Sequence, residues 1–359
     1  MYKSRIAGSK DYLVWNDFIR MSPNGNMRQS TYWGELKEDS GWTPHYFMVE
    51  NNGGVCATAL IQERKLPLVP YSLMYCCRGP VVDWTDEKTV EYLFASLRNY
   101  LRQRHAILLR MDPESTCEPK ALEQILQRHG SIKLSERVTK WNRALYTTRV
   151  VLDADEQALF GRLRKKMRQN INKARREGVI VDYTPSRDDP NVFARLMTGL
   201  ETRKDSLLHA SSYYAKVFEL LVQEGVGYFM KAKFNGEIIS GLVVVVLGEK
   251  AWGVFIANDY AYRQLMPNKV LVWEAICLAR KLGCRYLDLG STQGTAEYDP
   301  VNDPLDNFKE AFNPEVLYYS GYYDIPNLFY SAFRAVERSF LPLAMRGYVA
   351  MQRLLHSAK

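Results

Sequence analysis

The sequence has 359 residues, of which 47% are hydrophobic, 25% charged and 12% aromatic. These values exclude an intrinsically disordered chain, and the length suits two globular domains of ordinary size. The longest apolar run, residues 238–247, is about half as long as the roughly 20 residues that a membrane-spanning helix needs, so we expect no transmembrane segment.

The net charge is +8 at pH 7, which favours anionic partners such as nucleic acids, anionic lipids or phosphorylated substrates. The six cysteines show no C-x-x-C spacing and the five histidines are scattered, so we expect free thiols and no metal site. The free thiols, and the lack of an apolar leader after Lys3 and Arg5, predict a cytoplasmic protein.

One order of elements occurs twice along the chain. In both halves the pattern predicts a β-hairpin with a tight Asn-Gly turn, further strand, a helix, and a strand that ends in Asp. The hairpins, helices and closing strands are expected at 48–60, 86–104 and 106–111 in the first half, and at 231–243, 268–282 and 284–287 in the second. The chain therefore contains two copies of one α/β unit.

We expect an α/β (α+β) fold with one domain over residues 1–149 and another over residues 150–322. The order of hairpin, helix and strand resembles the Gcn5-related N-acetyltransferase (GNAT) fold of acyl-CoA N-acyltransferases, here in tandem. After the second domain, apolar residues between 327 and 356 fall near helical spacing, and they predict one or two amphipathic helices.

The segment 154–178 between the two copies predicts helix. From residue 163 onward it is basic and almost free of acids, and Gly178 ends the helix. Its apolar face consists of Leu163, Met167, Ile171 and Ala174. Two interpretations stand side by side, a solvated surface helix and a surface that binds the phosphates of RNA. The RNA-binding interpretation uses Arg164, Lys165, Arg168 and Lys173.

Two motifs in the first half place a cation near an expected cleft. A helix over residues 27–37 puts Gln29, Trp33 and Lys37 on one face, so that Lys37 either reaches an anionic ligand or is a surface lysine beside a core tryptophan. Further on, an apolar strand runs into Arg78-Gly79-Pro80. This turn either only ends the strand or holds Arg78 as an anion clamp.

Another motif pair follows in the second half. Asp288-x-Gly290 ends a strand, and Phe308-Lys309-x-x-Phe312 comes after a polar loop. A lysine between two aromatic anchors is more than a solvated charge. We expect Lys309 to stabilise an oxyanion or a phosphate at a reaction centre.

Together these motifs resemble those of the Fem (FemABX) family of aminoacyl-tRNA-dependent peptidyltransferases. The resemblance covers roughly residues 12–323 and rests on the order and spacing of the motifs. The motifs are Gln29-Ser30-x-x-Trp33-Gly34-x-x-Lys37, Arg78-Gly79-Pro80, Arg168-x-Asn170-Ile171-x-Lys173-Ala174, Asp288-x-Gly290 and Phe308-Lys309-x-x-Phe312.

The resemblance implies transfer of an amino acid from aminoacyl-tRNA to the stem-peptide amine of a peptidoglycan precursor, which forms an interpeptide bridge. It implies a first domain that binds a UDP-linked or lipid-linked muropeptide and is completed by C-terminal helices within residues 323–359. The second domain would receive the tRNA acceptor end and carry out catalysis. Aminoacyl-tRNA would be the co-substrate, with no other cofactor. The segment 154–178 is too short for the coiled-coil arm of some members.

By this resemblance, Lys37 contacts the precursor's diphosphate, and Arg78 belongs to the same cleft. His209 and Tyr213 match an Arg and a Tyr that bind the precursor in the family. Because His209 replaces the Arg, Arg203 is an alternative cation.

The resemblance also implies roles at the reaction centre. Lys309, preceded by Phe308, assists catalysis. Asp112 matches a family Asp, and both a catalytic base and a structural part in the Asp-Pro turn stay open for it. Trp252 or Phe255 lines the peptide channel where the family has a Tyr.

The chemistry needs no nucleotide hydrolysis, because the aminoacyl ester is already activated. The enzyme must hold the amine and the ester carbonyl in line, accept the amine's proton and support the tetrahedral oxyanion. Lys309 is the candidate for the oxyanion or the departing ribose oxygen, and a hydroxyl or phosphate of the tRNA is the candidate for the proton.

Three other functions stay open. An acetyl-CoA-dependent GNAT enzyme would need a glycine-containing loop before a helix, and residues 259–268 contain no glycine. A non-enzymatic RNA-binding protein would use the basic helix. The same transfer to another peptide or natural-product amine has the same sequence signature.

The C-terminal tail is basic. Its arginines are Arg334, Arg338, Arg346 and Arg353. We expect them at the anionic inner leaflet, where a lipid-linked acceptor would lie, so peripheral contact with the inner face of the cell membrane is an alternative to a purely cytoplasmic location.

Overall fold

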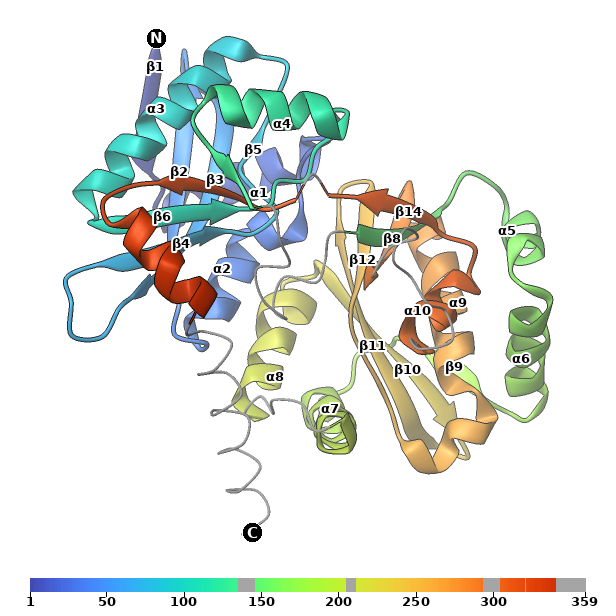
Figure 1. Cartoon of the computed structure of the whole chain (residues 1–359). Helices are drawn as coiled ribbons and strands as arrows, with labels where there is room; N and C mark the ends of the chain where they lie inside the picture. Colours follow the sequence, from blue (N-terminus) through green and yellow to red (C-terminus); the bar gives the residue numbers. More distant parts are fainter. Residues whose placement is uncertain (135–145, 205–210, 293–303, 320, 340–359) are drawn as a thin grey trace.

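The computed structural model describes residues 1–134, 146–204, 211–292, 304–319 and 321–339. Two sheets, each with helices packed against it, form two domains that lie side by side (Figure 1). The predicted α/β fold is therefore confirmed. In the described part of the chain, no helix combines the length and the apolar character needed to cross a bilayer.

The first sheet has the order β1-β2-β3-β4-β6-β15-β7, with β5 paired to β3. Phe47 and Val49 of β2 face the core under α3 and α4, whereas Tyr46 and Met48 face the core that contains α1 and α2. The strands are β1 Tyr2–Ile6, β2 Thr43–Asn51, β3 Gly54–Lys65, β4 Ser72–Cys76, β5 Val81–Val82, β6 Ala106–Met111, β7 Ile132–Lys133 and β15 Tyr323–Pro326. The helices are α1 Tyr12–Met21, α2 Thr31–Glu38, α3 Glu87–Gln103 and α4 Pro119–Arg128.

The second sheet has the order β14-β8-β13-β12-β11-β10-β9. Its strands are β8 Tyr146–Val151, β9 Ile180–Asp182, β10 Gly227–Phe234, β11 Glu237–Leu247, β12 Lys250–Asn258, β13 Tyr286–Thr292 and β14 Glu315–Tyr318. The helices are α5 Glu156–Arg162, α6 Lys165–Arg176, α7 Asp189–Lys204, α8 Ser211–Val217, α9 Pro267–Lys281 and α10 Pro304–Glu310. α9 lies between the sheet and α6 (Figure 1). The strand β8 crosses the predicted domain boundary at residues 149 and 150, and its partners β13 and β14 both belong to the second sheet.

One hydrophobic core is shared by the two domains. It joins Trp15 and Leu36 of α1 and α2 to Phe193 of α7, Tyr214 of α8 and Trp252 of β12. The domains therefore meet through buried apolar side chains and not through a solvated hinge.

The predicted hairpins and the predicted helices at 86–104 and 268–282 are confirmed within a few residues. Asn52-Gly53 and Asn235-Gly236 all have positive φ, as two-residue hairpin turns require. Two local predictions are wrong. β13 does not end at Asp288 but continues to Thr292, because a bulge at Gly290 (φ +86°) restores the pairing with β8. Gln29 is not part of the α-helix, because Ser30 caps it and Gln29 lies in a preceding 3-10 turn.

The C-terminal segment returns to the first domain. β15 pairs with β6 and β7, and residues 330–339 form a helix beside it. Arg110 of β6 forms ion pairs with Asp324 of β15 (2.8 Å) and Glu337 of the helix (2.7 Å), and Arg334 also pairs with Glu337.

The expectation that Arg334 contacts a membrane is therefore wrong. Its side chain is buried and forms an ion pair with the buried carboxylate of Glu337. Arg338 is exposed. Arg346 and Arg353 lie outside the described residues.

We predict that Arg110→Met lowers the free energy of unfolding by about 3–5 kcal/mol, because it leaves two buried carboxylates without their shared cation. Chemical denaturation measures this change. Arg128→Met is the control, since its pair with Glu87 is exposed and is expected to contribute less than about 1 kcal/mol. Equal losses in both variants would contradict this assignment.

Candidate active site

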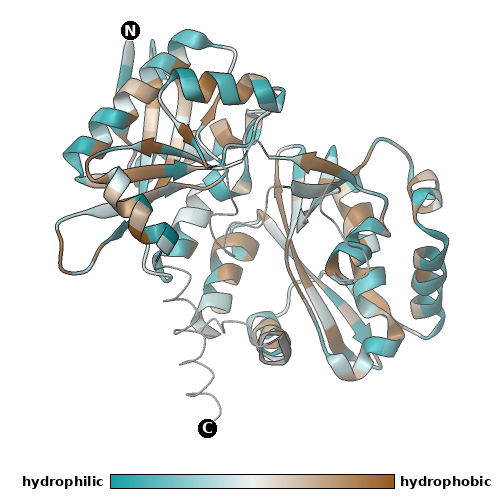
Figure 2. Cartoon of the chain, in the orientation of Figure 1, coloured by the Kyte–Doolittle hydropathy of each residue, from teal (hydrophilic) through white to brown (hydrophobic). Residues whose placement is uncertain are grey.

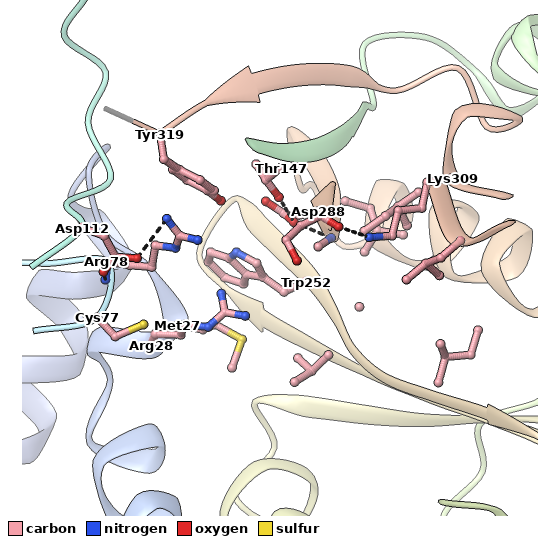
Figure 3. Close-up of a pocket in the computed structure, with 18 of the residues that line it drawn as sticks. Met27, Arg28, Cys77, Arg78, Asp112, Thr147, Trp252, Asp288, Lys309 and Tyr319 are labelled. Carbon is pink, nitrogen blue, oxygen red and sulfur yellow. Dashed lines mark hydrogen bonds and ion pairs between the residues drawn. The ribbon is translucent and has the colours of Figure 1, made fainter. Parts of the chain in front are cut away.

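A cavity of about 410 Å³ lies between the two domains. Its first-domain wall includes Met27, Arg28, Tyr75, Cys77, Arg78 and Asp112. Its second-domain wall includes Thr147, Trp252, Asp288, Gly290, Ser291, Phe308 and Lys309, with Tyr319 and Tyr322 from the segment that returns to the first domain. Figure 3 shows the labelled side chains converging from both domains.

The second-domain part of this cavity arises where two parallel strands separate. β12 and β13 pair only where Lys250–Trp252 lie opposite Tyr286–Asp288. Beyond these residues both strands continue, and residues of each line the space between them. The backbone groups of two strands thereby become available to a molecule in the cavity.

At the first-domain end, Gln29 and Gly79 hold the turn that carries Arg78. The Gln29 amide accepts a hydrogen bond from the backbone N–H of Leu60 (2.8 Å) and donates to the carbonyl of Cys77 (2.7 Å). A Cβ on Gly79 would lie 2.5 Å from the Gln29 side chain, so only glycine fits there. The first two sequence motifs are therefore parts of one packed unit.

Arg78 is held on both sides. Its guanidinium lies 3.5 Å from the centre of the Tyr319 ring and 3.2 Å from Asp112. Asp112 also accepts hydrogen bonds from the Tyr75 hydroxyl (3.0 Å) and from the backbone N–H of Arg78 (2.9 Å). Burial raises the pKa of Asp112, and Arg78 opposes that shift. This geometry favours the structural alternative for Asp112, which positions Arg78.

At the second-domain end, Asp288-x-Gly290 forms a closed turn beside Lys309. The Asp288 carboxylate accepts hydrogen bonds from the Gly290 N–H and the Thr147 hydroxyl, both at 2.8 Å. Lys309 is only 6% exposed, and its Nζ donates to the Ser291 carbonyl at 2.5 Å. The bulge at Gly290 thus delivers the carbonyl that orients Lys309.

The two aromatic residues of the Phe-Lys motif pack on each other at 5.3 Å between ring centres. Phe312 is buried in the core of the second domain. Phe308 lines the cavity beside Lys309. The two aromatic residues therefore anchor the short helix that carries Lys309.

A chain of ion pairs connects the two domains beside the cavity. Arg149 of β8 pairs with Asp288 (3.2 Å) and with Glu114, which follows β6 in the first domain. Glu114 also accepts a hydrogen bond from Asn26. The turn beside Lys309 is thereby tied to the first domain.

Trp252 has an unusual place in the cavity wall. Its side chain is buried, and its indole Nε1–H has no hydrogen-bond partner among the described residues. A buried donor without an acceptor costs about 1–3 kcal/mol. An oxygen atom of a bound molecule would satisfy it.

Lys37, Tyr213 and Phe255 lie together next to the cavity and not in its wall. Lys37 Nζ lies 4.5 Å from the centre of the Trp33 ring and 3.2 Å from the Tyr213 hydroxyl. Tyr213 in turn contacts Phe255. Arg28, which does line the cavity, lies over Trp33 as well (5.4 Å), so Trp33 joins the two cations. Burial lowers the pKa of Lys37.

Phe255 is not in the cavity wall where the resemblance placed it. Trp252 lines the cavity, whereas Phe255, beyond a bulge in β12, belongs to the same hydrophobic core and packs against Phe193 of α7. Arg203 lies in α7, and His209 lies outside the described residues.

The predicted helical segment 154–178 forms two helices, α5 and α6, which are interrupted at Leu163 and Arg164, and α6 is the basic one. Leu163, Met167, Ile171 and Ala174 are all buried, and Gly178 ends α6 with φ +92°. Lys165 and Lys173 are exposed. Arg168 donates to the carbonyl of Gly161 (2.8 Å), and Arg164 pairs with Glu310, the residue after Lys309 (2.7 Å). The start of α6 therefore touches the Phe-Lys motif.

The sequence does not single out Arg28 and Tyr319 as cavity residues, nor Arg149 as the partner of Asp288 beside the cavity. Tyr319 and Arg149 belong to no motif and take these places only through tertiary packing. For Arg28 the signal was its position beside Gln29.

Two family models match separate parts of the chain. Residues 12–132 match the model of the FemAB family, and residues 161–299 match that of an acetyltransferase (GNAT) domain. A lipid II:glycine glycyltransferase of Staphylococcus haemolyticus (strain JCSC1435) is 20% identical over 366 residues, which cover 82% of this chain and 86% of the relative. The first domain thus matches the FemAB family, and the second matches a GNAT domain. The resemblance expected from the motifs is confirmed.

Solved structures agree with the fold of this chain. The crystal structure of FemX has a TM-score of 0.84 at 19% identity and covers 93% of this chain and 100% of its own. A tandem GNAT protein from the clavulanic acid biosynthesis pathway has a TM-score of 0.52 at 12% identity, over 91% and 98% of the two chains. The predicted tandem GNAT-like architecture is therefore confirmed.

Proposed function

We propose that this chain transfers an amino acid from aminoacyl-tRNA to the stem-peptide amine of a peptidoglycan precursor, and so builds an interpeptide bridge. The observation that carries this proposal is the cavity, which brings cations of the first domain into one space with Lys309 of the second. Relatives named lipid II:glycine glycyltransferase support a transferase that acts on a lipid-linked muropeptide.

In the proposed reaction the precursor amine attacks the carbonyl carbon of the aminoacyl ester. A C–N bond forms, the C–O bond to the tRNA ribose breaks, and the amine loses a proton. The Lys309 ammonium stabilises the tetrahedral oxyanion or the departing ribose oxygen. Because Lys309 is buried and already oriented by the Ser291 carbonyl, its charge acts with little screening and little reorganisation.

The proton needs a different acceptor from the two buried aspartates. Asp112 is occupied by Tyr75 and Arg78, and Asp288 by Thr147, Gly290 and Arg149. We therefore assign the proton to a hydroxyl or phosphate of the tRNA. Aminoacyl-tRNA is the only co-substrate in this scheme.

The precursor's anionic part fits the first-domain end. Arg28 and Arg78 line the cavity there, and Trp33 connects Arg28 to Lys37. The stem peptide then passes Trp252 on its way to Lys309. On the other side, the exposed lysines of α6 provide a surface for the tRNA backbone, and Arg164 connects that surface to the residue after Lys309.

The direct test is incubation of the protein with a mixed pool of aminoacyl-tRNAs and a lipid-linked muropeptide, followed by mass spectrometry of the muropeptide. A mass increase by one or more amino-acid residues is the expected result. Acetyl-CoA replaces the aminoacyl-tRNA in a parallel reaction. Acetylation there, without any aminoacyl transfer, would overturn the proposal in favour of an ordinary GNAT enzyme.

We predict that Lys309→Met lowers kcat about 100- to 1000-fold and leaves precursor affinity nearly unchanged, because the lost charge acts mainly on the transition state. Steady-state kinetics and precursor binding measure the two effects. Lys281→Met, an exposed lysine at the end of α9, is the control. An unchanged kcat with a large loss of affinity would refute this role.

Lys37→Ala is expected to weaken precursor binding about 10- to 100-fold, because a partly buried cation loses its contact with phosphate. Calorimetry with the intact precursor and with one lacking its phosphates measures the difference. The neighbouring Lys216, which already pairs with Asp39 at 3.0 Å, provides the control substitution to Ala. An equal effect of Lys37→Ala on both ligands would argue against a diphosphate contact.

Trp252→Phe removes the indole N–H and keeps an aromatic ring. We expect acceptor affinity to fall about 2- to 10-fold, the value of a neutral hydrogen bond, with kcat nearly constant. Trp84→Phe is a matched control, because the Trp84 Nε1–H is also buried without a partner among the described residues but lies away from the cavity, against α3. Equal affinity losses in both variants would contradict a hydrogen bond between the Trp252 indole N–H and the acceptor.

Lys165→Glu is expected to weaken tRNA binding and to reduce the slope of log K against log salt concentration by about 0.7–0.9 for each lost phosphate contact. A filter-binding series at several salt concentrations measures this slope. Lys10→Glu makes the same charge change on the surface of the first domain and serves as the control. A slope that is the same in both variants would exclude α6 from the tRNA surface.

A further inference from the structure

The loop between β3 and β4 carries a surface that the proposed reaction does not use. Residues 66–71 are Leu-Pro-Leu-Val-Pro-Tyr, with no charged side chain. Leu68 is 104% exposed and Val69 is 45% exposed. Such a run of exposed apolar residues is unfavourable in water and usually marks a contact surface. We propose that this loop inserts into the surface of an anionic phospholipid bilayer.

A second segment, distant in sequence, enlarges the apolar surface. The rings of Tyr71 and Phe329 meet at 5.1 Å, which places Leu328 and Phe329 beside the loop. These two residues are 60% and 52% exposed. In Figure 1 the β3–β4 loop projects from the first domain near the C-terminal helix, and Figure 2 shows hydrophobic colour along this loop.

The backbone of the loop suits an apolar environment. The Leu66 N–H donates to the Tyr71 carbonyl (2.9 Å), which closes the loop. Pro67 and Pro70 have no backbone N–H. Within residues 67–70, only Leu68 and Val69 therefore carry a backbone N–H that lipid would leave without a hydrogen-bond acceptor. Leu68 has φ +67°, an unusual conformation for a large side chain.

Cations lie next to the apolar tip. A hollow of about 360 Å³ is lined by Lys65, Arg104 and His105 together with Val69, Pro70 and Tyr71 of the loop. The acid in this hollow, Glu63, is buried and bound by Arg104 (2.6 Å) and His45 (2.8 Å). The exposed Lys65 therefore faces solvent as a positive charge, which suits the phosphate of a lipid headgroup.

The shape of this surface favours a bilayer over a protein partner. Its apolar part is a projecting tip and not a groove, and its charged part lies behind the tip. A bilayer interface has the complementary order, with acyl chains below a layer of phosphates. The chain's net charge of +8 adds a general attraction to an anionic surface.

The loop also lies at the edge of the domain that carries Lys37. Arg64, at the end of β3, stacks on Trp42 (4.4 Å) and donates to the carbonyl of Ser40 (2.6 Å), just after α2. If the acceptor is lipid-linked, as the proposed function holds, a loop anchored at this edge brings the α2 end close to the membrane surface. The contact with lipid itself does not depend on that chemistry.

The experiment is flotation of the full-length protein with two kinds of vesicle, one of phosphatidylglycerol and phosphatidylcholine in equal amounts and one of phosphatidylcholine alone. The wild type should float with the anionic vesicles and much less with the neutral ones. Leu68→Glu should lower the partition coefficient about 10- to 100-fold, the value of one inserted leucine side chain. Leu13→Glu changes a leucine of similar exposure (81%) on α1 and should have no effect.

Three results would overturn the inference. They are no flotation of the wild type with either kind of vesicle, an equal loss of flotation in Leu68→Glu and Leu13→Glu, and equal binding of the wild type to neutral and anionic vesicles. Lys65→Glu should also weaken flotation with anionic vesicles. Because Leu68 is fully exposed, its substitution should leave the melting temperature and the turnover of a soluble UDP-linked precursor unchanged. Absent turnover in the wild type would refute the proposed function and leave the flotation result standing.

Discussion

Two buried cations of the second domain depend on partners in the first, and this dependence fixes how the domains meet. The Lys250 ammonium donates to the backbone carbonyls of Ser22 (2.6 Å) and Gly25 (2.8 Å), after α1, and burial lowers its pKa to about 8. Arg149 pairs with Glu114 of the first domain. A buried charge without a partner is costly, so separating the domains would leave polar groups unpaired in addition to exposing the shared apolar core.

The same interface controls the geometry around Lys309. Asp288 is bound both by Arg149, which is tied to the first domain, and by the N–H of Gly290. The next residue supplies the carbonyl that orients Lys309. The position of the proposed catalytic cation therefore depends on a contact between domains. Asp288, although conspicuous in the sequence, is a positioning residue in this scheme.

Local sequence signals predicted the elements well, because they depend on neighbouring residues. The Asn-Gly turns and the stop at Gly178 require positive φ, which few residues adopt readily. The cavity was harder to predict. Phe255 packs against α7 and α8 and not in the cavity wall, because where the wall lies depends on the packing of other elements and on a bulge in β12. Tyr319 reaches the cavity, and Arg149 reaches Asp288 in its wall, only after two sheets and a returning segment come together.

The two copies of the fold differ in the parallel strand pair of each sheet. In the first copy β4 and β6 remain paired from Ser72 to Cys76, and Arg78 is held just beyond the closed end. In the second copy the equivalent parallel strands separate after Trp252 and open the cavity. A closed sheet can present a fixed cation to a bound anion but offers no space between its strands. An open sheet offers that space, together with a buried lysine. Duplication followed by this divergence thus provides one half suited to holding a charged substrate and another suited to reacting with it.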